Sequence, residues 1–361
     1  MKQKVLCLID SLGFGGAERQ IIGLAVLLKQ NSYEVDLATY DEHDFKSEDI
    51  KKNNLNVIKL KAGRSKLSKL WAVRRQIEKK KYTSVIAYKT GPNIIGCLLK
   101  LMGMRFRLIV SERNTTQHIR LKERIQFQLY RMADYVVPNS QTQVDFICSH
   151  FPWLKSKTLP ITNFTDTDHF VAKHKATGDI INILTTARVA KQKNILRYLD
   201  AIVLLRDKGI TNIHFDWFGS VQSGQEKYAQ DVFNKVKELH LESLITFHPA
   251  TQQILEHYQN CDVFCLPSNY EGFPNVVCEA MSCGKPILCS RVCDNPYIVK
   301  EGKNALLFDN TNVEDIADKI QSICGMDHEE LTRWGHLSRK IAEELFSKEV
   351  FVRKYITLIE S

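Results

Sequence analysis

The segment between Val263 and Ser290 reads Val-Phe-Cys-Leu-Pro-Ser-Asn-Tyr-Glu-Gly-Phe-Pro-Asn-Val-Val-Cys-Glu-Ala-Met-Ser-Cys-Gly-Lys-Pro-Ile-Leu-Cys-Ser. Its apolar run Val263–Leu266 predicts a strand, the residues around Val276–Cys283 predict a helix, and Pro286–Ser290 predicts a second strand. Short connections between such elements are typical of parallel strands covered by helices on both faces. This segment therefore predicts an α/β protein.

The same alternation extends outward from this segment in both directions. The C-terminal half is expected to contain the strands Asp179–Ala187, Ile213–Phe218 and Ile245–Phe247, and the helices Ile195–Asp207, Tyr228–His240, Ile254–Asn260 and Ser347–Glu360. The N-terminal half is expected to contain the strands Val5–Ile9, Val35–Thr39, Val57–Leu60, Val85–Tyr88, Leu108–Val110 and Tyr135–Pro138, and the helices Arg19–Leu28 and Asn93–Leu101.

The length of 361 residues suits two domains better than one. The polar segment Thr165–Gly178 is the predicted linker. We therefore expect two Rossmann-like, doubly wound domains, at residues 1–170 and 171–346, which face a central cleft where ligands bind. Residues 347–361 are expected to form a C-terminal helix that packs back on the N-terminal domain.

The positive charge of the chain is concentrated in its N-terminal half. Residues 1–168 contain 28 Lys and Arg against 16 Asp and Glu, whereas residues 169–361 contain 22 against 25. The stretch from Lys51 to Lys81 has 12 basic residues and one acidic residue, Glu78. Such a face indicates an anionic partner, either a membrane surface or nucleic acid, and the alternative is a solvated lysine-rich surface.

Cysteine usage and apolar runs suggest the compartment. The ten cysteines lack a CxxC pair, and several lie in apolar runs such as Val263–Leu266, so buried reduced thiols are favoured over a metal site. No apolar run approaches the roughly 20 residues that span a bilayer. The N-terminal residues resemble a first strand and not a signal peptide. The expected location is the cytoplasm.

A glycine-rich turn follows the first strand, in the sequence Ser11-Leu-Gly-Phe-Gly-Gly-Ala-Glu-Arg19. Gly13, Gly15 and Gly16 permit close approach of the backbone, and the helix that begins there offers free N–H groups to an anion. The turn lacks the Gly-Lys-Ser/Thr ending of a P-loop and the spacing of a GxGxxG fingerprint. A tight connection between strand and helix is the alternative interpretation.

A second motif, Thr186-Ala-Arg-Val-Ala-Lys-Gln-Lys-Asn194, follows the first strand of the C-terminal half. Arg188 and Lys193 are expected in a loop at the carboxyl end of that strand, where α/β sheets bind ligands. Two cations in such a loop suit a diphosphate, since Arg binds in a fork and Lys adds a point charge. The alternative is a solvated basic loop.

The third motif lies within the segment quoted first, where Glu271 and Glu279 are separated by seven residues. Glu271 is expected on the loop, and Glu279 within about a turn of the start of a helix that begins near Asn275, close to free N–H groups. Carboxylates placed in this way are able to hold a hexose and a ribose diol. A helix-capping acid and an unrelated surface acid are the alternative.

Taken together, these motifs resemble glycosyltransferase family four, the retaining group with the GT-B fold. The resemblance covers nearly the whole chain: Gly15–Arg19 is similar to the glycine loop, Arg188 and Lys193 to the Arg-x4-Lys pair, and Glu271 with Glu279 to the Glu-x7-Glu signature. The block Glu279–Pro286 is similar to the family's helix and strand. Ser111-Glu-Arg-Asn114 resembles the members found in bacterial capsule, exopolysaccharide and O-antigen synthesis.

The resemblance implies a role for each matched residue. Glu271, Arg188 and Lys193 would be catalytic, Glu271 orienting the donor hexose and the two cations neutralising the diphosphate leaving group. Glu279 would hold the nucleotide ribose. The donor-binding set would be completed by Gly15, Gly16, Gly219, Gly272, Phe273, Pro274, Asn275 and Val276. No cofactor is implied, no metal is expected, and no Asp-x-Asp motif is present.

Two departures from the family pattern concern the donor and acceptor sides. Where many relatives have Gly-Gly followed by Glu, this chain reads Asp294-Asn-Pro-Tyr297, with Asn295 as a candidate for a contact on the phosphate side of the donor. Where many relatives place a His, it reads Ser111–Asn114. Arg113 and His118 are the candidate acceptor-side residues, and the alternative for His118 is a surface histidine on a basic helix.

The resulting expectation is a retaining, metal-independent hexosyltransferase. It would move a hexose or N-acetylhexosamine from a nucleotide-diphosphate sugar, UDP-linked or alternatively GDP-mannose, to a polyprenyl-diphosphate-linked sugar of a surface polysaccharide. The basic patches Lys59–Lys81 and Arg120–Arg131, with Trp71, Phe127 and Tyr130 interleaved, would hold it peripherally on the anionic inner face of the plasma membrane. Nucleic acid is not an expected partner, because no recognition module accompanies the patches.

Other classes of protein are less consistent with the motifs. A phosphorylase would need a pyridoxal-lysine context, and an epimerase would lack the Glu-x7-Glu block. A non-catalytic nucleotide-sugar-binding or assembly protein of the same pathway is the remaining alternative. It would have lost a key residue, whereas Arg188, Lys193, Glu271 and Glu279 are all present.

Overall fold

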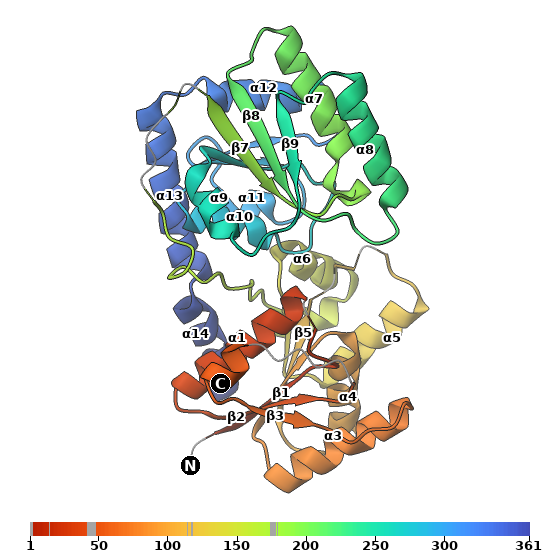
Figure 1. Cartoon of the computed structure of the whole chain (residues 1–361). Helices are drawn as coiled ribbons and strands as arrows, with labels where there is room; N and C mark the ends of the chain where they lie inside the picture. Colours follow the sequence, from red (N-terminus) through yellow and green to blue (C-terminus); the bar gives the residue numbers. More distant parts are fainter. Residues whose placement is uncertain are drawn as a thin grey trace. The chain divides into compact units, whose positions relative to one another are not determined.

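The computed structural model describes residues 3–13, 15–41, 48–113, 115–116, 118–173, 178 and 180–361. The chain divides into two compact units, which are described separately (Figure 1). Unit 1 comprises Met1–Phe164 together with Lys348–Ser361, and unit 2 comprises Thr165–Ser347. The division falls six residues before the predicted boundary at 170, and the C-terminal helix is part of unit 1.

Unit 1 contains a six-stranded parallel sheet in the order β3-β2-β1-β4-β5-β6. Its strands are β1 (Lys4–Leu8), β2 (Glu34–Thr39), β3 (Asn56–Lys59), β4 (Ser84–Tyr88), β5 (Arg107–Glu112) and β6 (Tyr135–Pro138). β1 is central and pairs with β2 and β4, with Val5 opposite Val35 on one side and opposite Ser84 on the other.

The helices of unit 1 cover both faces of this sheet. They are α1 (Gly16–Gln30), α2 (Glu48–Lys52), α3 (Lys66–Lys80), α4 (Thr90–Leu101), α5 (Leu121–Leu129), α6 (Gln141–His150) and α14 (Lys348–Glu360), with the short 3₁₀ helices η1 (Tyr130–Met132) and η2 (Pro152–Lys157). Alternate residues of β1 enter different cores, because strand side chains point to opposite faces. Val5 and Cys7 pack with α1 and α14, whereas Leu6 and Leu8 pack with α3 and α4.

Unit 2 repeats the same topology. Its sheet has the order β12-β11-β10-β7-β8-β9, which becomes the order of unit 1 when the strands are counted from β7 and the sheet is read from β9. The strands are β7 (Ile181–Thr186), β8 (Ile213–Phe218), β9 (Ile245–His248), β10 (Val263–Leu266), β11 (Ile287–Ser290) and β12 (Ala305–Phe308). The helices are η3 (Lys191–Lys193), α7 (Ile195–Asp207), α8 (Glu226–Glu238), α9 (Ile254–Asn260), α10 (Asn275–Ser282), α11 (Asn295–Ile298), α12 (Val313–Cys324) and α13 (His328–Phe346).

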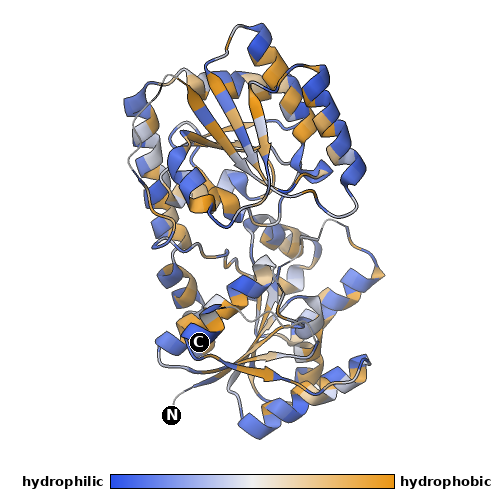
Figure 2. Ribbon diagram, viewed as in Figure 1, coloured by the Kyte–Doolittle hydropathy of each residue, from blue (hydrophilic) through white to orange (hydrophobic). Residues whose placement is uncertain are grey.

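The predicted α/β fold with two doubly wound sheets is confirmed. Figure 2 shows strands that are largely hydrophobic and helices with one hydrophobic and one hydrophilic side, as expected when both faces of a sheet are covered. The sequence pattern did not predict the helices α2, α3, α5, α6, α11, α12 and α13 or the edge strand β12. The predicted linker Thr165–Gly178 belongs to unit 2 where it is described, since Arg339 Nη1 of α13 donates to the carbonyl oxygens of Thr167 at 3.0 Å and Phe170 at 2.6 Å.

All ten cysteines are reduced thiols outside any disulfide, as predicted, and seven of them are buried. Burial raises the pKa of the Cys7 and Cys265 thiols to about 12, which keeps them protonated and unreactive at neutral pH. Among the described residues, no helix is both long enough and apolar enough to cross a bilayer.

Candidate active site

The candidate site in unit 2 lies at the carboxyl ends of β7 and β10, which are paired neighbours at the centre of the sheet. The chain leaves these two strands in opposite directions along the sheet, because β8 follows β7 on one side and β11 follows β10 on the other. A sheet of this type binds ligands at such a switch point. The loop after β7 carries Arg188 and Lys193, and the loop after β10 carries Glu271.

Lys193 and Glu271 form a buried ion pair between these two loops. Lys193 Nζ lies 2.5 Å from Glu271 Oε1, and both residues are buried. Asn194, which follows Lys193, has a left-handed conformation with φ of 58° and turns the chain into α7. Two residues 78 positions apart in the sequence are therefore brought together in one site, and their predicted catalytic roles stay predictions.

Three hydrogen bonds to backbone carbonyl oxygens connect the same two loops. Asn269 N donates to Gln192 O at 2.8 Å, and Gln192 Nε2 donates to Tyr270 O at 2.8 Å. Asn269 Nδ2 also donates to Lys191 O at 3.0 Å. These bonds join the residues that immediately precede Lys193 and Glu271 on the two loops, so they restrict how far the two side chains are able to separate.

A third loop, after β11, contacts Glu271 from its backbone side. The Glu271 amide donates to Cys293 Sγ at 3.3 Å, and Cys293 adopts a left-handed φ of 48°. Burial raises the pKa of the Cys293 thiol. Asn295 is fully buried and donates from Nδ2 to Ser290 O at 2.8 Å, while its Oδ1 has no partner among the described residues. A donor contact by Asn295 stays a prediction.

Arg188 differs from Lys193 in being exposed. Its guanidinium makes no hydrogen bond or ion pair with the residues that the structure describes. The loop passes close to Gly219, which follows β8: a Cβ at Gly219 would lie 1.9 Å from Ala187 O, on the backbone next to Arg188. Only glycine fits at this position. Close packing against the backbone next to Arg188 therefore explains why residue 219 is a glycine.

The segment from Gly272 to Val276 enters α10, which begins at Asn275 as predicted. The ring of Phe273 is buried and packs edge-on against Phe346 at 5.8 Å between centroids. Pro274 occupies the position before the helix. Because its side chain is in the core, Phe273 anchors the loop, and any donor contact that it makes would come from its backbone.

Glu279 lies farther along α10 than the sequence indicated. It is the fifth residue of the helix, and the first turn contains no acidic side chain. Tyr258 OH donates to Glu279 Oε2 at 3.0 Å, and the same hydroxyl lies 2.8 Å from Thr186 Oγ1. Burial raises the pKa of Tyr258 well above its ordinary value, so its hydroxyl remains a donor. Tyr258 thus positions Glu279, and sequence reasoning did not identify it.

The glycine turn of unit 1 opens α1 at Gly16, directly after Gly15. The Glu18 carboxylate lies over Gly15, since a Cβ there would be 2.3 Å from Glu18 Oε2. Lys89 Nζ, at the start of α4, contacts Glu18 Oε1 at 2.6 Å and Asp10 Oδ1 at 3.0 Å. Burial alone would lower the pKa of Lys89, but the hydrogen bonds that it donates to these two carboxylates raise it. An anion at this helix end would meet Glu18, and the predicted roles of Gly15 and Gly16 stay predictions.

Arg113 of unit 1 is occupied by contacts within the fold. Its Nη2 donates to the hydroxyls of Tyr88 and Tyr355, both at 2.7 Å, and Nη1 donates to Asn163 Oδ1 at 2.8 Å. The guanidinium also lies over the Tyr88 ring, 4.2 Å from its centroid. Since Tyr355 is on α14, Arg113 ties the C-terminal helix to unit 1. Asn114, the last residue of the predicted Ser111–Asn114 motif, lies outside the described residues.

His118 is exposed and lines a polar cavity of about 600 Å³ in unit 1, with Thr90 and Arg120. The buried carboxyl of Glu112, which ends β5, lines the same cavity. Its Oε1 accepts hydrogen bonds from Asn93 Nδ2 at 3.0 Å, Gln126 Nε2 at 3.1 Å and Tyr130 OH. Burial raises the pKa of Glu112, and these hydrogen bonds oppose that rise. The sequence indicated Glu112 only as part of the Ser111–Asn114 motif.

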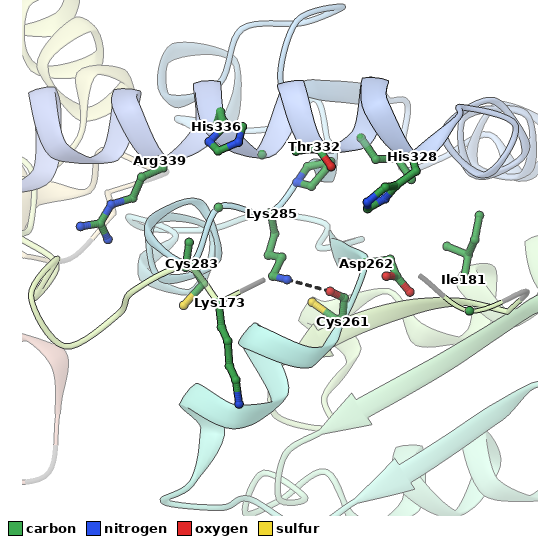
Figure 3. Close-up of a pocket in the computed structure, with 16 residues that line it drawn as sticks. Lys173, Ile181, Cys261, Asp262, Cys283, Lys285, His328, Thr332, His336 and Arg339 are labelled. Carbon is green, nitrogen blue, oxygen red and sulfur yellow. Dashed lines mark hydrogen bonds between the residues drawn. The ribbon is translucent and has the colours of Figure 1, made fainter. Parts of the chain in front are cut away.

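Another cavity, of about 260 Å³, lies in unit 2 at the amino ends of the strands, and it contains none of the predicted site residues. Figure 3 shows His328, His336 and Arg339 projecting toward it from one helix, α13, with Lys285 beneath. Lys285 Nζ donates to Gln259 O at 2.9 Å and Cys261 O at 2.8 Å, at the end of α9. Lys285, in the predicted block Glu279–Pro286, thus has a structural use.

No group of three or more His, Cys, Asp or Glu that would hold a metal ion occurs among the described residues. The expectation of a metal-independent reaction rests on the family resemblance and stays a prediction.

Two family models match this chain. The description "Glycosyltransferase Family 4" applies to residues 14–169, and "Glycosyl transferases group 1" applies to residues 166–340. These two matches follow one another and together span most of both units. The chain belongs to the glycosyltransferases of family four, with the GT-B fold.

Individual relatives have low sequence identity to this chain, but the similarity extends over most of its length. The N-acetylgalactosamine-N,N'-diacetylbacillosaminyl-diphospho-undecaprenol 4-alpha-N-acetylgalactosaminyltransferase of Campylobacter jejuni is 24% identical over 308 residues, 80% of each chain. The amylovoran biosynthesis glycosyltransferase AmsD of Erwinia amylovora is 24% identical over 321 residues, 84% of this chain and 87% of that protein. The crystal structure of Anabaena HepE in complex with UDP has a TM-score of 0.85 and 19% identity, and covers 99% of this chain and 100% of that chain. The protein is thus a glycosyltransferase similar to those of bacterial surface-polysaccharide synthesis.

Proposed function

We propose that this protein transfers a hexose or N-acetylhexosamine from a UDP-sugar to a polyprenyl-diphosphate-linked sugar, with retention of configuration and without a metal ion or other cofactor. The reaction would take place at the cytoplasmic face of the membrane and would extend a surface polysaccharide. The observation that carries the proposal is the buried Lys193–Glu271 pair, with Arg188 on the same loop as Lys193 and without a side-chain partner in the part of the chain that the structure describes.

The charges of this site suit departure of a nucleoside diphosphate. In the proposed reaction the bond between the sugar C1 and the β-phosphate oxygen breaks, and the acceptor hydroxyl forms the new C1–O bond on the same face. The acceptor proton passes to the departing phosphate oxygen. Negative charge grows on the diphosphate, and preorganised cations stabilise it because they need no reorientation. Arg188 is free to fork two phosphate oxygens, and Lys193 adds a positive charge held in place by Glu271.

Glu271 has two tasks in this proposal. One carboxylate oxygen, Oε1, holds Lys193, while the other is available to hydroxyls of the donor sugar. Glu279, oriented by Tyr258, would accept hydrogen bonds from the ribose diol. Support for the nucleotide comes from the similarity to HepE, whose structure contains UDP, and support for the acceptor comes from the name of the Campylobacter relative.

The test is a panel of nucleotide sugars read by isothermal calorimetry: UDP-GlcNAc, UDP-GalNAc, UDP-galactose, UDP-glucose and GDP-mannose. We expect one UDP-sugar to bind, and Glu271→Gln to weaken it by at least about tenfold through loss of a charged hydrogen bond. Glu238→Gln, on the surface of α8, is the matched control and should bind as wild type. If no donor binds to folded protein, the proposal is wrong.

Transfer itself is followed with the donor that binds and a polyprenyl-diphosphate-linked sugar. Anomeric configuration is read by NMR of the product, and the reaction is repeated in EDTA. An inverted product, or loss of activity in EDTA that is restored by a divalent cation, would contradict the mechanism. Donor binding without transfer to any lipid-linked sugar would favour the non-catalytic alternative.

A further inference from the structure

We propose that helix α5 and the neighbouring 3₁₀ helix η2 form the surface by which unit 1 binds an anionic lipid bilayer. This docking surface consists of Leu121, Ile125 and Trp153, with the cations Arg124 and Lys155 at its edge. The inference rests on the proposed function in one respect, because a polyprenyl-linked acceptor reaches the enzyme from a membrane.

Large apolar side chains of this surface face solvent. Leu121 is 73% exposed, Ile125 is 54% exposed and Trp153 is 46% exposed. Leu121 and Ile125 are four residues apart on α5 and therefore share one face of that helix. The opposite face of the same segment is already used, since Phe127 and Tyr130 are fully buried in the core of unit 1.

A groove joins two of the exposed side chains, Ile125 and Trp153. It has a volume of about 500 Å³ and is lined by Ile119, Ile125 and Leu129 on one side and by Phe151 and Trp153 on the other. The Trp153 ring is held edge-on against Phe151, with 5.6 Å between centroids. A tryptophan fixed beside aliphatic residues, with one end in water, is typical of the membrane interface.

The charge around the groove complements anionic lipid. Residues 120–131 contain four basic side chains and one acidic side chain, Glu123. That carboxylate is engaged locally, because it accepts from the Arg120 amide at 3.0 Å and lies 3.3 Å from Lys122 Nζ. Lys155 adds a further exposed cation on η2. An apolar stripe flanked by Lys and Arg binds anionic bilayers through both burial and charge.

The position of α5 relates this surface to the candidate acceptor side. Arg120 and Lys122 line the polar cavity that contains His118 and Glu112, whereas Arg124 and Ile125 line the apolar groove. One helix, about 10–12 Å across, thus separates the two. A bilayer that receives the apolar face of α5 would bring lipid headgroups to the polar cavity on its other flank.

The structure also corrects the surface expected from the sequence. Of the aromatic residues predicted to meet the membrane, Phe127 and Tyr130 are in the core and only Trp71 is exposed. Trp71 lies on α3, where the Arg74 guanidinium covers its ring at 4.9 Å from the centroid. The basic helix α3, with the exposed side chains Leu67 and Trp71, is therefore the alternative membrane-binding surface against which α5 has to be tested.

The experiment is co-sedimentation of the full chain with vesicles of phosphatidylglycerol and phosphatidylethanolamine, compared with vesicles of phosphatidylcholine. We expect binding to the anionic vesicles and a loss of about tenfold or more in partition for Leu121→Ser/Ile125→Ser and for Arg124→Glu/Lys155→Glu. High salt should weaken wild-type binding, since part of the attraction is between charges. Quenching of tryptophan fluorescence by brominated lipid should be largely lost in Trp153→Phe.

Two double variants serve as controls. Leu67→Ser/Trp71→Ser removes the exposed apolar pair of α3, and Leu101→Ser/Met102→Ser removes a pair at the end of α4. Both should bind vesicles as wild type. Loss of binding in the α3 variant with normal binding in the α5 variants would overturn the proposal. So would a change in oligomeric state of Leu121→Ser/Ile125→Ser with unchanged vesicle binding, because the occupant would then be a second copy of the chain.

The outcome is separable from that of the proposed function. Leu121→Ser/Ile125→Ser should bind the nucleotide sugar with wild-type affinity, because the donor site is in unit 2. Vesicle binding without binding of any donor would leave the docking surface intact and refute the proposed function. If the protein binds the donor and transfers the sugar but does not bind anionic vesicles, only the docking surface is refuted.

Discussion

The two units have the same sheet topology, and each has an ion pair between the loops that follow its first and fourth strands. The positions of the positive and negative side chains in that pair are exchanged between the units. In unit 2 the cation Lys193 follows the first strand, β7, and its carboxylate partner Glu271 follows the fourth, β10. In unit 1 the carboxylates of Asp10 and Glu18 follow the first strand, β1, and the cation Lys89 follows the fourth, β4. Each sheet thus has an ion pair across its switch point, with the signs exchanged.

Under the proposed function, the exchange of signs favours binding of a nucleoside diphosphate at unit 2 over binding at the corresponding place in unit 1. Unit 2 has a second cation, Arg188, beyond the pair, whereas in unit 1 two carboxylates share one lysine. A diphosphate is attracted to the first arrangement and repelled by the second. The shared fold therefore supplies the place for a ligand, and the side chains on four loops decide its charge.

The largest expected effect comes from breaking the unit 2 pair. Lys193→Met leaves Glu271 buried without its partner, which should cost about 3–5 kcal/mol of unfolding free energy and abolish transfer. Lys89→Met, the counterpart in unit 1, should cost less, about 1–3 kcal/mol, because the Lys89 side chain is 23% exposed against 11% for Lys193, although the Glu18 carboxylate is as buried as that of Glu271. Calorimetric unfolding and donor titration measure both. Equal losses in the two variants would remove the distinction between the pairs.

Substitution of the glycines next to these pairs should also cost more stability in unit 2 than in unit 1. A Cβ at Gly219 would meet the backbone oxygen of Ala187, whereas a Cβ at Gly15 would meet the carboxylate at the far end of the Glu18 side chain. We expect Gly219→Ala to destabilise the protein by about 2–3 kcal/mol and Gly15→Ala by less than about 1 kcal/mol. Chemical denaturation provides the values. A tolerated Gly219→Ala would mean that the loop bearing Arg188 is free to move.

The smallest expected effect concerns Glu112 and depends on pH. Its pKa in the folded protein is raised, so above both its folded and unfolded pKa values the charged form costs stability. That cost disappears as the pH falls toward the ordinary value for glutamate. Glu112→Gln keeps an acceptor for Tyr130 and removes the charge, so its melting temperature at pH 8 should exceed wild type by about 2–4 °C.

The pH series provides the check on this prediction. The difference between Glu112→Gln and wild type should shrink as the pH is lowered through the window between the two pKa values. Glu78→Gln, at an exposed pair with Arg74, should change the melting temperature by less than about 1 °C at any pH. A lower melting temperature for Glu112→Gln at pH 8 would show that the charged carboxyl stabilises unit 1.

The elements that the sequence predicted well are those whose signal is local. The bounds of α7, β8, α9 and β10 agree with the predictions to the residue, because each is a continuous apolar or amphipathic run between clear breaks. For the segments that form the basic helices α3 and α5, the sequence predicted basic patches but no helix. Their apolar residues are sparse, and half of those on α5 face solvent where a sequence pattern would place them in a core.

The sequence by itself determined the class of fold, the restart of the pattern in the C-terminal half, and the motifs that contain Arg188, Lys193, Glu271 and Glu279. Only the tertiary structure decided which of these residues meet. Lys193 and Glu271 pair because β7 and β10 are neighbours, Tyr258 reaches Glu279 from another helix, and Arg113 is engaged by Tyr355, 242 positions along the chain. The physical reason is that strand order, which brings distant loops to one edge of a sheet, is a property of long-range packing and is not written in any contiguous run of residues.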